Sequence, residues 1–116
     1  MELTGKCKEE FEKWLVCGGG KETFEKYYED DDNIYDTYDW FDKHSTSMQY
    51  GVYVDFFDSV GQKIHISYSE GLSLGGVEGF YYTIDYRTYN KVVDTRQEAR
   101  EQAITKANEI YNDANR

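Results

Sequence analysis

The chain has 116 residues, of which 23 are acidic and 13 basic, so its formal net charge is −10. This length indicates one domain, and the acidity disfavours direct binding to DNA, RNA or an anionic membrane, because all three are negatively charged. No run approaches the roughly 18 apolar residues of a membrane span, and the first residues contain no apolar signal-peptide region, so we expect a cytoplasmic protein outside the membrane.

The first predicted element is a helix over residues 5–17. Four apolar side chains recur at helical spacing and are expected to face a core: Cys7, Phe11, Trp14 and Leu15. Thr4 is the predicted N-cap, and Gly18 follows the last turn. A disulfide between Cys7 and Cys17 is excluded on one helix, where about 15 Å would separate them. We therefore expect reduced thiols, as in cytosolic proteins.

Residues 18–45 form an insert that begins with three glycines and is rich in acidic and aromatic side chains. Its stretch 21–45 contains nine acidic and three basic residues. Ile34, Tyr38 and Phe41 have helical spacing and predict a short helix over 33–43. A mobile insert is the alternative, because the run 29–32 consists of four adjacent acidic residues that repel one another.

Residues 46–60 fit two patterns. Val52, Val54 and Phe56 alternate as in a strand. The helical pattern is longer, because apolar side chains recur from Tyr50 to Val60 at spacings of three and four. Thr46 and Gln49 match a capping box, and Gly61 would end the helix, so we favour a helix.

The remaining elements are three strands and a helix. The strands are predicted at Lys63–Tyr68, Phe80–Tyr86 and Lys91–Asp94, with a glycine-rich loop at 69–79 and a turn at Arg87–Asn90. The helix spans 96–112. Thr95 and Glu98 form its capping box, and its buried face is Ala99, Ala103, Ala107, Ile110 and Tyr111. The predicted fold is therefore α+β: an N-terminal helix, a second helix, and a three-stranded antiparallel sheet on which the C-terminal helix packs, in one domain over 1–116.

Patterns for catalysis and metal binding are weak. A calcium loop starting at Asp30 fails, because Ile34 and Tyr35 occupy its fifth and sixth positions. Asp55 and Asp58 would lie one turn apart, but no partner group accompanies them. The two histidines, His44 and His65, are too few for a zinc site, and no phosphate-binding loop is present. We expect no enzymatic activity, no cofactor and no bound metal.

The predicted order helix, three strands, helix over residues 46–112 is similar to the double-stranded-RNA-binding domain. The stretch Arg96-Gln97-Glu98-Ala99-Arg100 resembles the basic start of that family's last helix, with Gln97 replacing one lysine. In that family these side chains reach RNA phosphates, so the resemblance implies RNA contact by Arg96 and Arg100. The family's Gly-Pro-x-His loop motif is missing between the first two strands.

A second resemblance covers about 45 residues. The stretches 3–15 (LTGKCKEEFEKWL), 47–61 (SMQYGVYVDFFDSVG) and 95–112 resemble small uncharacterised proteins of gut bacteria and their phages. The resemblance implies a phage or prophage accessory protein, and it supplies no functional residues.

The function predicted from these observations is non-catalytic interaction with another protein, with a basic partner expected. The candidate contact residues are Asp30, Asp31, Asp32, Tyr35, Asp36, Tyr38, Asp39, Trp40 and Phe41. Tyrosine and tryptophan are enriched at interface hot spots, and carboxylates steer basic partners. The alternative is that these aromatics close the core over the first helix.

A narrower hypothesis is an acidic mimic of nucleic acid that inhibits a nucleic-acid-binding host protein, since residues 1–58 carry a charge of −9. No pattern indicates the oligomeric state, although the strand at 80–86 is a candidate exposed edge.

Overall fold

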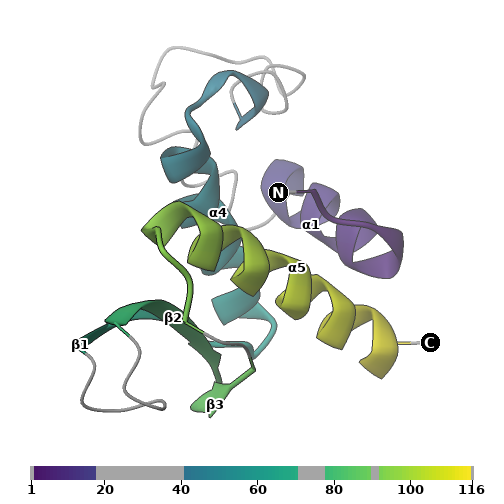
Figure 1. Cartoon of the computed structure of the whole chain (residues 1–116). Helices are drawn as coiled ribbons and strands as arrows, with labels where there is room; N and C mark the ends of the chain where they lie inside the picture. The colour runs from purple at the N-terminus through teal and green to yellow at the C-terminus, as the bar shows by residue number, and fades with distance from the viewer. Residues whose placement is uncertain (1, 18–40, 71–77, 90–91, 116) are drawn as a thin grey trace.

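The computed structural model describes residues 2–17, 41–70, 78–89 and 92–115, with helices, an antiparallel sheet and a C-terminal helix packed on that sheet. This is the predicted α+β fold (Figure 1). Its elements are α1 (Gly5–Cys17), α4 (Thr46–Ser59), β1 (Ile64–Glu70), β2 (Glu78–Ile84), β3 (Arg87–Thr88) and α5 (Arg96–Ala114). In the described part of the chain, no helix has both the length and the apolar character needed to cross a membrane.

The three strands lie in the order β1-β2-β3, all antiparallel. The predicted turn at Arg87–Asn90 is wrong by two residues. The chain turns at Asp85 and Tyr86, whose φ angles are 51° and 72°, and β3 begins directly afterwards. Two successive left-handed residues connect a tight hairpin, a position where glycine or asparagine is the usual signal. Asp85 tolerates this conformation, and its carboxylate accepts the Lys63 N–H at 2.9 Å.

Lys91, the first residue of the predicted third strand at Lys91–Asp94, lies outside the described part, and the described residues 92–94 form a single bridge at Val93 instead of a strand. Phe80 and Val93 exchange both backbone hydrogen bonds, at 2.8 and 2.7 Å. Gly79 allows this approach, because its φ is +147° and a Cβ there would lie 2.5 Å from the Val93 carbonyl oxygen. Since β2 is paired on both sides, the expectation of an exposed edge at 80–86 is also wrong: β1 is the long outer strand.

The ambiguous stretch 46–60 is helical, as favoured. Its cap differs from the prediction, because Ser45 rather than Thr46 is the N-cap and its side chain accepts the Met48 N–H. Gln49 instead donates to the Phe41 carbonyl at 2.9 Å. Gly61 follows the helix with a φ of +87°, as expected for a glycine terminator.

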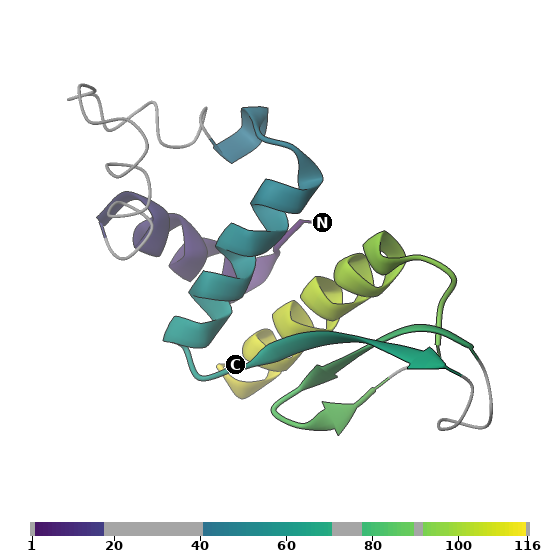
Figure 2. The same cartoon turned by 90° about the vertical axis from the view of Figure 1, so that its left-hand side faces the viewer.

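The strand-like alternation within α4 has a structural reason, because the helix is buried on more than one side. Its buried residues are Val52, Tyr53, Phe56 and Phe57. In Figure 2, α4 lies beside both α1 and α5, and its Tyr53 and Phe56 rings contact Phe11 of α1 while the helix also packs on α5 and β1. A helix that packs on two neighbours needs a wider apolar surface than a single stripe provides.

The terminal helices match their predicted ranges closely. Thr95 caps α5 by accepting the Glu98 N–H at 3.1 Å. Ala99, Ala103 and Ala107 are fully buried, and Ile104, which the predicted face omitted, is buried with them.

On α1, Cys7, Phe11 and Leu15 are buried, as its stripe predicted, and Trp14 packs against them from a half-buried position. Cys7 is a free thiol. Residues 33–40 of the predicted short helix lie outside the described part, whereas 41–43 are helical.

Candidate functional site

Eight of the nine predicted contact residues, all except Phe41, lie outside the described part of the chain. Phe41 is 7 % exposed and packs in the core. Its ring centroid lies 5.3 Å from that of Phe11 and 5.1 Å from that of Tyr53. For this residue, the structure agrees with the alternative in which an aromatic side chain closes the core over α1.

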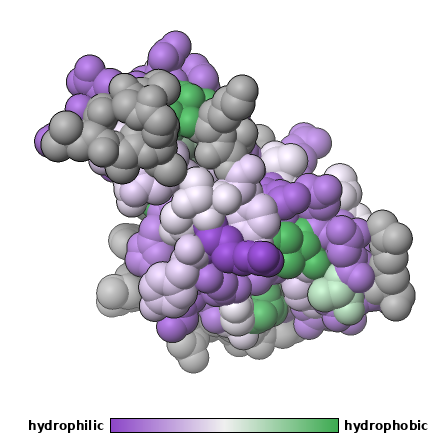
Figure 3. All heavy atoms as spheres, turned by 60° about the horizontal axis from the view of Figure 1, so that its bottom comes forward, coloured by the Kyte–Doolittle hydropathy of each residue, from purple (hydrophilic) through white to green (hydrophobic). Residues whose placement is uncertain are grey.

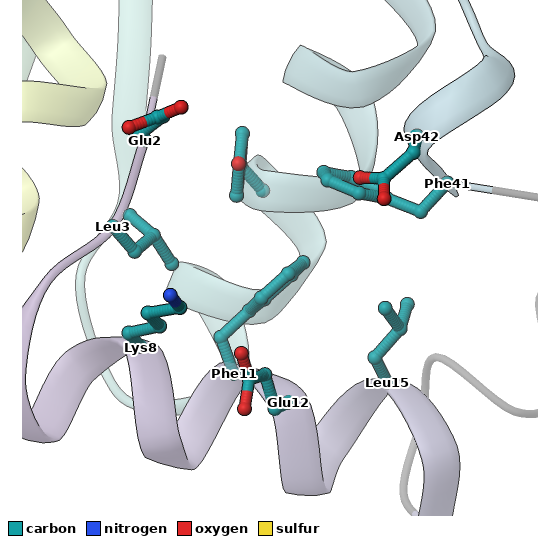
Figure 4. Close-up of a pocket in the computed structure, with 9 residues that line it drawn as sticks. Glu2, Leu3, Lys8, Phe11, Glu12, Leu15, Phe41 and Asp42 are labelled. Atoms are coloured by element: carbon teal, nitrogen blue, oxygen red, sulfur yellow. The ribbon is translucent and has the colours of Figure 1, made fainter. Parts of the chain in front are cut away.

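A pocket of about 310 Å³ opens beside Phe41, between α1, α4 and the residues that precede each helix (Figure 4). Two regions of the chain, residues 2–15 and 41–53, therefore meet around one hollow. It is lined by Glu2, Leu3, Lys8, Phe11, Glu12, Leu15, Phe41, Asp42 and Tyr53.

The floor of the pocket is aromatic. Phe11, Phe41 and Tyr53 pack against one another with centroid distances of 5.0–5.3 Å, in tilted or edge-to-face geometry. Each ring is at most 7 % exposed, and such pairs contribute beyond their buried area. The rings therefore form a rigid base rather than loose surface side chains.

The rim of the pocket is predominantly negative. Three carboxylates, those of Glu2, Glu12 and Asp42, line it with one ammonium group, that of Lys8. Figure 4 shows Lys8 and Glu12 rising from α1, with Glu2 and Asp42 on the facing segments. Burial, and then the negative charges of Asp42 and Glu2, raise the pKa of Tyr53 to about 12. The phenol thus stays protonated at neutral pH, next to an excess of carboxylates.

The wall formed by α1 is held in place by α5. Asn112 accepts the Cys7 N–H at 2.9 Å and donates to the Thr4 carbonyl at 2.9 Å. Asn108 accepts the Thr4 N–H at 2.9 Å and donates to its hydroxyl at 3.0 Å. Thr4 occupies the predicted cap position, since its carbonyl accepts from Lys8 N–H. The side chain that accepts a first-turn N–H of α1, that of Cys7, belongs to Asn112.

We call these hydrogen bonds from Asn108 and Asn112 of α5 to Thr4 and Cys7 the clamp. No pattern among neighbouring residues in the sequence predicts it. The residues that these hydrogen bonds join are 104 to 108 positions apart in the sequence. Gly5, which lies between Thr4 and Cys7, has a φ of +59°. A Cβ on Gly5 would lie 3.1 Å from the Asn112 amide oxygen. Gly5 therefore permits both the backbone turn and the close approach of Asn112.

The groups considered for catalysis do not form a site. The pKa of Asp55 is raised by burial and then by the charge of Asp58, yet both side chains lie on the exposed side of α4. His65 is exposed on β1, and His44 is half-buried before α4. Within the described ranges, no group of three or more His, Cys, Asp or Glu side chains is arranged to hold a metal ion.

The basic residues for which RNA contact was implied pack against aromatic rings. The Arg96 guanidinium lies 5.0 Å from the Phe80 ring centroid, and that of Arg100 lies 5.1 Å from the Tyr50 centroid. Arg100 also donates to the Ser47 hydroxyl at 3.1 Å. Both cations thus contribute to the packing of α5 against the sheet and α4.

Comparison with protein-family models, curated proteins and solved structures finds no match.

Proposed function

We propose that the chain is a non-catalytic interaction module that binds a basic segment of another protein at the pocket between α1 and α4. The observation that carries this proposal is the combination of a rigid aromatic floor with three rim carboxylates and one ammonium group. A lysine or arginine side chain matches both parts, because its aliphatic stem packs on apolar surface while its charged end pairs with carboxylates.

The sequence adjoining the pocket supports the same partner chemistry. Asp42, on the rim, is the last acidic residue of the stretch 21–45, which contains six more acidic than basic residues. A single sign of charge around a binding site accelerates encounter with a partner of opposite sign, and raised ionic strength weakens this attraction. We therefore expect binding that is strong at low salt and weak at high salt.

The distribution of charge favours one narrower candidate. Residues 1–58 carry −9, whereas residues 59–116 carry −1. A protein with one strongly negative half has the charge needed to occupy the basic groove of a nucleic-acid-binding protein, and the resemblance to phage proteins is consistent with such an accessory role. Under this second proposal, DNA would compete with the chain for the same partner.

The test compares three baits in a pull-down from bacterial lysate: the unmodified chain, Asp42→Lys and Glu101→Lys. Both variants change the charge by the same amount, but Glu101 is an exposed residue of α5 that does not line the pocket. We expect a basic protein to be retained at low salt by the unmodified chain and by Glu101→Lys, and to be lost with Asp42→Lys and in high-salt washes.

Equal recovery with the two variants would contradict the pocket as the binding site. Recovery of an acidic protein, or of RNA itself, would contradict the partner chemistry. Displacement of the captured protein by added DNA would distinguish the nucleic-acid mimic from other interaction roles.

A further inference from the structure

The two edges of the sheet differ in length and in protection. At one edge, β3 has only two residues, and the chain continues to the bridge between Val93 and Phe80. At the other edge, β1 has seven residues, and in the described part of the chain no strand lies beyond it. Of the two edge strands that the structure describes, β1 is the one long enough to pair with a further strand.

The hydrogen-bond pattern identifies the backbone groups that point outward from β1. Phe80 exchanges both backbone bonds with Val93, so the even-numbered residues of β2 bond away from β1. The odd-numbered residues of β2 therefore bond to β1, and the register pairs them with His65, Ser67 and Ser69. The outward N–H and C=O groups belong to Ile64, Ile66, Tyr68 and Glu70.

Between Lys63, which precedes β1, and Glu70, its last residue, this edge lacks the features that usually prevent strand pairing. Natural edge strands are blunted by lysine, proline, bulges or shortness. The stretch 65–69 contains no acidic residue, lysine or arginine, and the chain has no proline. The register between β1 and β2 runs without interruption from Ile64 to Glu70, so there is no bulge.

An exposed aromatic side chain lies on the same strand. Tyr68 is 47 % exposed, although its ring contacts Phe80 and its hydroxyl donates to Glu78. The face seen in Figure 3, at the end of the molecule where the sheet lies, is mainly hydrophilic or intermediate, with only small separate hydrophobic areas. This surface favours pairing at the strand edge over stacking of one sheet face on another.

We propose that β1 pairs antiparallel with β1 of a second copy of this chain, joining two sheets into one of six strands. A second copy can meet this edge without opposing like charges, because residues 65–69, which would face one another, contain no acidic residue, lysine or arginine. With the two-fold axis at Ser67, Ile66 of each copy lies opposite Tyr68 of the other, a favourable β-branched and aromatic pair. The even-numbered residues then bond to one another, as the outward groups require.

Sedimentation velocity over about 10 to 500 µM tests this pairing, because the contact is smaller than a standard interface and the association is expected to be weak. The variant Tyr68→Lys replaces the aromatic side chain opposite Ile66 by a cation, and it brings the lysines of the two copies into diagonal positions across the pair. Tyr86→Lys is the matched control, since Tyr86 is 86 % exposed in the β2–β3 turn. We expect a concentration-dependent dimer whose Kd rises at least about tenfold in Tyr68→Lys and is unchanged in Tyr86→Lys.

A second variant, Ile66→Pro, removes an outward N–H that takes no part in the ladder with β2, and it should likewise yield monomer. Circular dichroism verifies that each variant keeps its fold. A monomer at every concentration of the unmodified chain would overturn the proposal, as would a dimer weakened equally by Tyr68→Lys and Tyr86→Lys.

Discussion

Replacing Asn112 with alanine tests whether α5 holds α1 in place. The substitution removes an acceptor 2.9 Å from the Cys7 N–H and a donor 2.9 Å from the Thr4 carbonyl. Loss of a helix N-cap costs about 1 kcal/mol, and the second hydrogen bond contributes about 1 kcal/mol. We therefore expect the free energy of unfolding to fall by about 2 kcal/mol, which for a domain of this size lowers Tm by about 8 °C.

The assay is urea and thermal unfolding followed by circular dichroism. Asn115→Ala is the matched control, because Asn115 also lies at the end of α5 but bonds only within its own turn, to the Tyr111 carbonyl. Asn112→Asp keeps the acceptor beside the positive end of α1 and should recover about half of the loss. If Asn112→Ala and Asn115→Ala had the same free energy of unfolding, the hydrogen bonds of Asn112 would not be what holds α1 in place.

For three further changes, the structure determines whether the free energy of unfolding rises or falls. Gly79→Ala should destabilise by more than about 1 kcal/mol, because its φ of +147° and a backbone oxygen 2.5 Å from the new Cβ oppose it. Gly51→Ala in α4 meets nothing within 4 Å and should stabilise by about 0.5–1 kcal/mol in the same urea assay; destabilisation would contradict the helix there. Burial raises the pKa of Cys7 from 9.0 to about 12, and that of Tyr53 is also about 12, so both protonated forms are favoured by folding. The free energy of unfolding should therefore decline as the pH rises from about 9 to 12. In the variant Cys17→Ser, the one remaining thiol, that of Cys7, should react with a thiol reagent only after the protein unfolds.

Local sequence signals predicted much of the fold. The cap and alanine face of α5 depend on residues within a few positions of one another, and Thr95 behaves as predicted. The cap of α4 was misplaced by one residue because Ser45 and Thr46 are both good cap residues. The turn at Asp85 and Tyr86 was missed because neither residue is glycine or asparagine, the usual signals for two left-handed positions.

The candidate site could not be predicted, because its residues are far apart in the chain. Glu2 and Phe11 come from one region, and Asp42 and Tyr53 come from another about 30 to 50 residues later. The two regions meet only after α1 docks. The aromatic spacing on α1 and α4 indicates buried faces, but it does not indicate that an open hollow remains between them. The clamp of Asn112 on Thr4 is likewise visible only in three dimensions.

The most direct test of the proposed function is an NMR titration of the ¹⁵N-labelled chain with a blocked lysine-rich peptide and with its glutamine counterpart. Binding at the pocket predicts saturable shifts of the amides of Phe11, Leu15 and Asp42 with the lysine peptide alone. These shifts should disappear in Asp42→Lys and at high salt, and persist in Glu101→Lys. Shifts that are equal for both peptides, or unaffected by Asp42→Lys, would contradict recognition of a basic partner at this site.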